Sequence, residues 1–549
     1  MATIIFICFL GYTLLLFGIN WLTAKQGSND TFFRANKKSP WPIVAYGMIG
    51  ANISGVTFMS VPGYVQSSQF TYFAFILGNV LGYIVIALVL LPLYYKLDLT
   101  SIYAYLEKRF GFWSRHCGSF FFFISKLMGA AVRMYLVTFV LYEFVFKNWG
   151  IPFWVPAFIF TAIMLLYTIK GGLRTIIWTD TLQTTFLLLA AGFTIYFILK
   201  HTGFSLWELL KESSEAGHTK IVETDWKAGS FFWKQILSGI FLTIAMNGLD
   251  QDMMQKSLSC KNLRSAQKNA FTLSFSLVLV NLLFLVLGAT LLHYASHVSF
   301  VLPEKADKIF PIIAFDLSTV TIVLFIIGLL AAGYSSADSA LTALTTAICF
   351  DFLGFDRDKK SKQTVFKNPF TKLCFIGLAC VLLTVIISSG IIIHPVWKTL
   401  LPVILFAGIL SFIFFGLTIS TEKNIPDENK VKVRKTVHII CSLLFFCIIV
   451  AFEPFHTDSL IKTVYDIASL TYGPLLGLFC FGLFTKWQIE EKYVPFIAIS
   501  SPVICYILKL YSEELFNGYK FGFELLLVNG LLTFIGLCLC IRKSRKNLL

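Results

Sequence analysis

The run of residues 331–339 combines small residues, hydroxyls and one carboxylate inside a long apolar stretch. Ser335, Ser336 and Ser339 all lie within three residues of Asp338. A carboxylate at bilayer depth costs about 2.5–3.5 kcal/mol on insertion scales unless it faces a partner, an ion or water. Carboxylate and hydroxyl oxygens are the ligands that hard cations prefer. The pattern therefore predicts a cation site inside a membrane.

A second polar segment, residues 50–57, contains Asn52, Ser54 and Thr57 within a glycine-rich apolar run. Glycine and proline let a spanning helix unwind locally, and the freed backbone carbonyl oxygens can replace the water around a cation. The same glycines could instead serve close helix packing. The sequence Tyr472-Gly473-Pro474 predicts a similar interruption in a later helix.

A second carboxylate, Asp180, follows the glycine turn Gly171-Gly172. If Arg174 lies at the membrane interface, Asp180 lies about 9 Å further inward at about 1.5 Å of rise per residue. Asp180 and Asp338 are thus two candidate in-membrane acids. Each could instead be an interfacial cap or one partner of a structural ion pair.

These residues need helices to position them, and the composition predicts an all-α polytopic membrane protein. Of the 549 residues, 57% are hydrophobic and 14% are charged. Apolar runs of about 20 residues, the length that crosses a bilayer core, recur along the whole chain. A soluble protein with buried helices would instead show apolar runs of about 10–14 residues.

Fifteen spanning helices are predicted, and their odd number is consistent with an N-terminus outside and a C-terminus in the cytoplasm, the orientation that the basic loops indicate. The first run has no basic n-region and no cleavage-site pattern, so it is predicted to be a retained helix. The predicted spans are 3–22, 41–63, 71–96, 118–145, 151–169, 174–199, 231–252, 270–294, 311–350, 372–393, 397–420, 435–453, 459–484, 492–512 and 522–541. Residues 97–112 are predicted to form a short amphipathic helix on the cytoplasmic surface.

The net charge of +15 is distributed by loop, which favours the positive-inside pattern over nucleic-acid binding. One of the basic loops predicted to be cytoplasmic contains Lys256, Lys261, Arg264 and Lys268. The 12 cysteines show no metal-ligand or disulfide-framework spacing, and the eight histidines are scattered. The chain is therefore not expected to be an enzyme or to bind nucleic acid.

Several motifs together give the chain a specific resemblance. In chain order they are Gly50-x-Asn52-Ile53-Ser54, Gly171-Gly172-Leu173, Trp178-Thr179-Asp180-x-Leu182-Gln183, Asp250-Gln251-Asp252-x-x-Gln255, Ala332-x-x-Ser335-Ser336 and Tyr472-Gly473-Pro474-Leu475-Leu476-Gly477. This set resembles the sodium:solute symporter family, which includes sodium-coupled sugar, proline, sialic acid, iodide and vitamin transporters.

The resemblance implies one transporter domain over residues 1–549 with the inverted-repeat fold of the bacterial leucine transporter (LeuT-like, five plus five helices). The first repeat would be 41–199 and the second 231–484, with further helices at the N-terminus and at 492–541. Relatives usually lack the extra pair of spans within about 356–430, which is predicted to lie at the periphery.

Two ion sites follow from the resemblance. The principal sodium site would use carbonyls of Gly50, Ile53 and Ala332 and hydroxyls of Ser335 and Ser336, although relatives usually have alanine in place of Gly50. A second sodium site would use Ser335 with Asp180, Asp338 and Ser339. The sialic acid transporters of the family have serine where this chain has Asp338, and two acids facing one site could instead share a proton.

Arg133 is the main candidate for binding the solute. A lone guanidinium in a spanning helix needs an anion or carbonyl oxygens, and its fork fits a carboxylate. In sialic acid transporters of the family an arginine on the same helix binds the sugar acid. The alternative is an ion pair with Asp180 or Asp338. Further candidates for the pocket wall are Ser54, Thr57, Tyr72, Asn79 and Phe241.

The predicted function is sodium-coupled import of a sugar, sialic acid or another carboxylate by alternating access across the cell membrane. Its partners would be sodium, the solute and the lipid bilayer, and the protein is predicted to work as a monomer. Proton coupling on the same fold, or a transporter-like channel or sensor, remains the alternative.

Overall fold

The computed structural model describes residues 2–23, 28–303, 305–356, 427–453, 460–519 and 521–542. Within these ranges every regular element is a helix. The α-helices are α1 (Ala2–Thr23), α2 (Asn29–Arg34), α3 (Trp41–Asn52), α4 (Gly55–Ser68), α5 (Tyr72–Val85), α6 (Leu91–Lys96), α7 (Ala104–Arg109), α8 (Phe112–Leu141), α9 (Trp154–Gly171), α10 (Leu173–Thr202), α11 (Leu206–Glu215), α12 (Phe232–Thr243), α13 (Gln251–Leu258), α14 (Leu263–His297), α15 (Ala306–Leu317), α16 (Thr319–Ala347), α19 (Asp427–Ala451), α20 (Leu460–Phe484), α21 (Val494–Leu510), α22 (Ser512–Leu515) and α23 (Leu525–Leu539).

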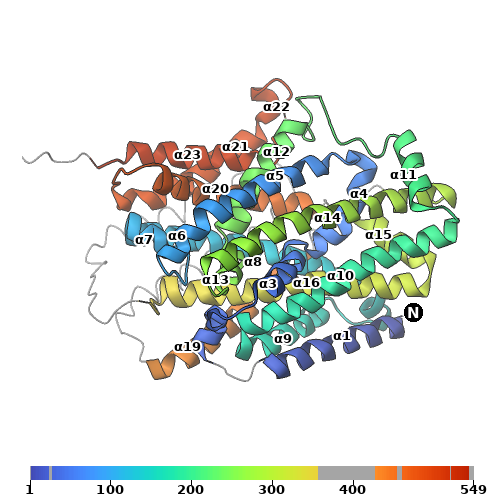
Figure 1. Cartoon of the computed structure of the whole chain (residues 1–549), viewed down its shortest axis with the longest axis horizontal. Coiled ribbons are helices and arrows are strands. Elements are labelled where there is room, and N and C mark those ends of the chain that lie inside the picture. The colour runs from blue at the N-terminus through green and yellow to red at the C-terminus, as the bar shows by residue number, and fades with distance from the viewer. Residues whose placement is uncertain are drawn as a thin grey trace, which may run out of the picture.

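Ten helical segments in the described ranges are long and apolar enough to cross a membrane, and the bent pair α3 and α4 would make eleven. Figure 1 shows the long helices running side by side, with α1 and α9 along one edge of the bundle and α21 and α23 along the opposite edge. Near its centre α10 packs against both α16 and α3. The protein is therefore a multi-pass membrane protein. The predicted spans 372–393 and 397–420 lie outside the described residues.

The break predicted in the span 41–63 is confirmed. Helices α3 and α4 meet at a bend of 62°. Ile53 ends α3 with extended dihedral angles, and the hydroxyl of Ser54 caps α4 by accepting a hydrogen bond from the backbone N–H of Thr57. A serine at the N-cap satisfies a backbone donor that the new helix would otherwise leave unpaired. The chain can therefore stop and restart its helix in the middle of the span.

Two other predicted spans were wrong as single helices. The span 311–350 is divided at Ser318, which is fully extended and caps α16 by accepting from the N–H of Thr321. The span 231–252 consists of α12 and a π-helical segment, Ile244–Gly248, and it ends before Asp250. Asp250 then caps α13 through its side chain. Apolar composition alone does not reveal such caps, so the sequence analysis merged these segments.

The interruption predicted at Tyr472-Gly473-Pro474 was also wrong, because α20 runs from Leu460 to Phe484 with Pro474 inside it. Gly473 instead allows close packing against α23. A Cβ atom at Gly473 would lie 2.2 Å from Cγ of Asn529. Here the packing explanation for small residues in a spanning helix is the correct one.

The amphipathic segment predicted at 97–112 contains α7, but α7 does not simply lie on the surface. Tyr103 and Leu106 are fully buried. Arg109 donates hydrogen bonds to the backbone carbonyls of Thr485 and Trp487, beyond the end of α20. The segment therefore packs into the protein.

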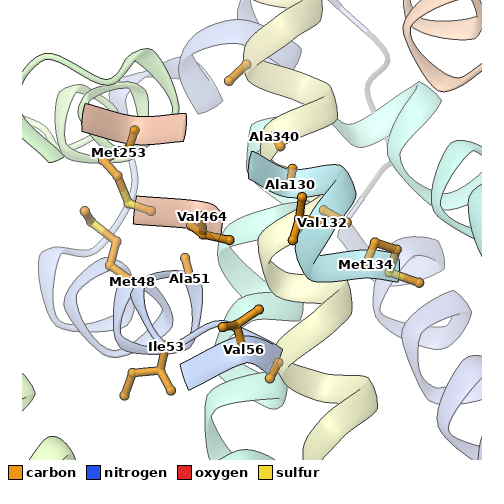
Figure 2. Packing of buried hydrophobic residues seen from close by; sticks show 14 of the residues in the cluster. Met48, Ala51, Ile53, Val56, Ala130, Val132, Met134, Met253, Ala340 and Val464 are labelled. Carbon is orange, nitrogen blue, oxygen red and sulfur yellow. The ribbon is translucent and has the colours of Figure 1, made fainter. Parts of the chain in front are cut away.

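Apolar packing holds the broken helix in place. Figure 2 shows side chains from α3, α4, α8, α13, α16 and α20 around the break, labelled Met48, Ala51, Ile53, Val56, Ala130, Val132, Met134, Met253, Ala340 and Val464. All of them are buried. Helices distant in sequence thus determine where the ends of α3 and α4 lie.

Candidate functional site

The end of α3 offers free carbonyl oxygens beside the hydroxyls of α16. The last four carbonyls of a helix have no partner within the helix. Among the described residues, Ile49 is the one of these four that regains a partner, from the N–H of Ile53. Gly50 lies in the same final turn. Helix α16 packs against both α3 and α4 and carries Ser335 and Ser336 in its buried middle. Carbonyl and hydroxyl oxygens therefore lie on adjacent elements here.

Ser336 fits a cation ligand especially well. Its side chain is 3% exposed, and its Oγ has no hydrogen-bond partner among the described residues. A buried hydroxyl without a partner costs free energy unless something else binds it. A small hard cation would satisfy this oxygen, and the neighbouring carbonyls would add dipoles without net charge. The donor set thus fits sodium.

The glycine at position 50 has a physical explanation. The N–H of Gly50 donates a 3.0 Å hydrogen bond to Oγ1 of Thr184 on α10. A Cβ atom on Gly50 would lie 2.4 Å from the same oxygen. An alanine would clash at this close approach, so the departure from the usual family residue matches a local contact and leaves the carbonyl in place.

Asp180 lies at the meeting point of α10, α13 and α16. Its Oδ1 accepts a 2.7 Å hydrogen bond from Ser335, and its Oδ2 lies 2.8 Å from Nζ of Lys256. Lys256 also donates a 2.6 Å hydrogen bond to Oγ of Ser339. The four side chains are all buried. The structure therefore brings the predicted Asp180, Ser335 and Ser339 together, with a lysine among them.

The sequence analysis missed Lys256 and wrongly assigned it to a cytoplasmic loop. Lys256 lies on α13 and is 1% exposed. It directly follows Gln255 of the quoted family motif and lies one helical turn after Asp252, at 3.8 Å from that carboxylate. The spacing of Lys256 from Asp252, one helical turn, was the sequence feature that could have indicated a buried ion pair.

Asp338 has different partners. Its Oδ2 accepts a 2.8 Å hydrogen bond from the hydroxyl of Tyr167 on α9, and its Oδ1 accepts one from the backbone N–H of Ser339. No ion pair to Asp338 is formed within the described part of the chain. The alternative of a structural ion pair therefore applies to Asp180 and not to Asp338.

A second buried charge cluster lies at the N-terminal end of α13 and was also missed. Nζ of Lys126 on α8 lies 3.2 Å from Asp250 and 2.7 Å from Asp252. The hydroxyl of Tyr472 on α20 donates to Asp250 as well. A lysine within the predicted span 118–145 was the available signal, since charges in spanning helices need partners.

A partly open cavity lies next to the helix break, lined by Ala51, Asn52, Ile53 and Ser54. It brings together most of the predicted solute contacts, namely Ser54, Thr57, Tyr72, Asn79 and Arg133. Phe241 does not appear in its wall and packs against the apolar core instead.

The guanidinium of Arg133 is without an ion pair in the described ranges. Its Nε is buried and has no hydrogen-bond partner there. Asp180 pairs with Lys256, and Asp338 bonds Tyr167, so neither carboxylate neutralises Arg133. The alternative of an ion pair with one of them is excluded by this arrangement.

The comparison with known families agrees with this geometry. A model of the sodium:solute symporter family matches residues 32–420. The chain belongs to this family. Members of this family couple solute movement to sodium, so the protein is a sodium-coupled solute symporter, and sodium is its coupling ion.

Individual relatives include two bacterial sialic acid symporters. The sodium/sialic acid symporter NanT of Aliivibrio fischeri is 26% identical over 363 residues, which cover 64% of this chain and 68% of the relative. SiaT of Proteus mirabilis is 26% identical over 371 residues, covering 64% and 70%. The human sodium/iodide cotransporter is 23% identical over 245 residues, covering 44% and 37%.

Solved structures share the fold. A substrate-bound, outward-open sodium-coupled sialic acid symporter superposes with a TM-score of 0.73 at 19% identity, covering 98% of this chain and 99% of that one. The nucleobase-cation-symport transporter Mhp1 gives a TM-score of 0.52 at 13% identity, covering 92% and 93%. The predicted all-helical LeuT-like fold class is therefore confirmed.

Proposed function

We propose that this symporter imports a small organic carboxylate, with a sialic acid or related sugar acid as the leading candidate, together with sodium bound at the Gly50, Ile53, Ala332, Ser335 and Ser336 site. The observation that carries the proposal is the guanidinium of Arg133 in the wall of the cavity, which forms no ion pair with any residue that the structure describes and whose Nε has no hydrogen-bond partner there. A fork of N–H donors without an anion is suited to a carboxylate. The sialic acid symporters among the relatives support the choice of solute.

Arg133 is the cationic side chain of the cavity wall that has no carboxylate within ion-pair distance among the described residues. Lys126 also lines the cavity, but its ammonium is already ion-paired with Asp250 and Asp252. Arg133 therefore contributes the positive charge that a solute can use. Hydrogen-bonding groups such as Ser54, Thr57 and Asn79 are available for the hydroxyl groups of a sugar.

Coupling follows from the residues that the two sites share. Ile53 would give its carbonyl to sodium, and the same residue lines the solute cavity. Sodium bound between α3 and α16 would hold the break in one arrangement and so complete the solute-binding wall. Sodium and solute then favour the same state, and such coupling amounts to about 1–3 kcal/mol. Alternating access follows when the protein with both ligands bound closes toward the outside and opens toward the cytoplasm.

Two further assignments belong to this proposal. The repeats would be 41–199 and 231–484, and a break near the start of each supports this division, at Ile53 in the first and before Asp250 in the second. The N-terminus would be outside and the C-terminus cytoplasmic, as the basic loops indicate. The transport unit would be the monomer.

Uptake into proteoliposomes tests the proposal. Radiolabelled sialic acid would be offered under an inward sodium gradient, with the free acid, its methyl ester, a neutral N-acetyl sugar and short monocarboxylates as competitors. We expect the carboxylates to compete and the ester and neutral sugar to fail. Equal competition by a neutral sugar would contradict the role of Arg133, and uptake driven by a proton gradient alone would contradict sodium coupling.

A further inference from the structure

The second sodium site expected from the resemblance contains a cationic side chain of the protein itself. Nζ of Lys256 lies 2.8 Å from Asp180 and 2.6 Å from Ser339, two of the expected ligands. A third expected ligand, Ser335, donates its proton to the other oxygen of Asp180. We propose that the ammonium of Lys256 takes the place of a second coupling cation, so that the protein carries one sodium ion per solute molecule. This inference rests on the sodium symport proposed above.

The ammonium of Lys256 and a sodium ion are chemically similar enough for one to occupy the position of the other. An ammonium carries the same unit charge as sodium and can donate three hydrogen bonds to the oxygens that sodium would bind. A sodium ion bound to the same Asp180 and Ser339 oxygens would lie within about 5 Å of Nζ, where two unit positive charges repel strongly in a buried site. Lys256 and a second sodium therefore compete for one position.

The lysine is held in this position from two sides. Helix α13 begins with the side-chain cap of Asp250 and carries Lys256 in its last turn. Asp252, one turn earlier, lies 3.8 Å from Lys256 and 2.7 Å from Lys126. Carboxylates and ammoniums thus alternate from α10 through α13 to α8. The positive charge beside Asp180 is covalently attached, so it stays there at any external sodium concentration.

The principal sodium site shares Ser335 with the second site but differs from it in the other ligands. Its expected ligands are neutral, and Oγ of Ser336 is buried without a partner in the described part of the chain. Both carboxylate oxygens of Asp180, by contrast, already accept hydrogen bonds, one from Lys256 and one from Ser335. Asp338, the remaining expected ligand of the second site, accepts hydrogen bonds from Tyr167 and from the N–H of Ser339. The principal site is thus left for an exchangeable ion.

Equilibrium binding of radioactive ²²Na⁺ to the purified full-length protein tests the inference. The wild type should bind one sodium per chain, and Lys256→Arg, which keeps the charge, should also bind one. Lys256→Met removes the ammonium and frees Asp180 and Ser339, so it should bind two. Adding Asp180→Asn to Lys256→Met removes the released carboxylate and should return the value to one.

The outcomes separate this inference from the proposed function. Two sodium ions per wild-type chain would overturn the lysine assignment and leave sodium symport intact. One sodium in a folded Lys256→Met variant would overturn it as well. No sodium binding by the wild type would overturn the proposed function and this inference together. If Lys256→Met does not fold, the wild-type value and the sodium-to-solute ratio from reversal potentials in proteoliposomes still decide the question.

Discussion

Oγ of Ser335 donates a 2.7 Å hydrogen bond to Oδ1 of Asp180, and this bond joins α16 to α10 where Asp180 packs against Gly47 of α3. Ser335, itself an expected sodium ligand, thus links the sodium site on α16 to the buried ion pair of Asp180 with Lys256. A substitution that alters the ion pair should therefore also affect sodium binding, and a substitution in the sodium site should affect the ion pair. The predictions below follow from this arrangement and from the contacts around it.

Replacing Ser336 by alanine should abolish sodium-stimulated uptake while membrane insertion stays intact. Its Oγ has no partner among the described residues, so truncation removes a cation ligand without breaking a structural bond. Uptake and surface expression would be measured side by side. Ser442→Ala is a suitable control, because Ser442 is equally buried but bonds the carbonyl of His438 on α19. Full uptake by the Ser336→Ala variant would contradict the ion-site assignment.

Asp180→Ala should abolish uptake and also lower thermal stability, because it leaves the ammonium of Lys256 buried without its closest carboxylate. Breaking a buried ion pair from one side typically costs about 3–5 kcal/mol. Thermal unfolding in detergent would measure the loss. The double variant Asp180→Ala with Lys256→Met should recover much of the stability but not the uptake, since no unpaired charge remains. A double variant no more stable than the single one would contradict the pairing.

Gly50→Ala should destabilise the protein, because the new Cβ would lie 2.4 Å from Oγ1 of Thr184. Overpacking of this kind typically costs about 1–3 kcal/mol. Adding Thr184→Ala removes the clashing oxygen and should restore part of the melting temperature. Gly192→Ala on the same α10 is the control, since nothing lies within 4 Å of a Cβ there. Equal melting temperatures for Gly50→Ala and Gly192→Ala would contradict the close approach.

Arg133→Gln should raise the KM for a carboxylate solute by about 10-fold to 100-fold, the range expected when a charged hydrogen-bond partner is lost. The melting temperature should change little, because Arg133 forms no ion pair within the described residues. Arg133→Lys keeps the charge but loses the fork, so its KM should be intermediate. An unchanged KM in Arg133→Gln would place the solute carboxylate elsewhere.

Much of the fold could be predicted because it depends on local composition. Apolar runs about 20 residues long identify membrane spans wherever they occur, and the glycines and polar residues at 50–57 predicted the break that α3 and α4 form. The break at Ser318 and the continuity of α20 through Pro474 were not predictable in this way. They depend on one capping hydrogen bond and on contacts with a neighbouring helix.

The sequence by itself determined the membrane class, the family resemblance and the identity of the candidate oxygen ligands, because these depend on residue types and their spacing. Only the tertiary structure decided which charges face each other. Lys256 looks like one more basic loop residue, and its closest carboxylate, Asp180, lies 76 residues earlier in the chain. A buried ammonium is stable only beside such a partner, and the packing of α10, α13 and α16 brings the two together.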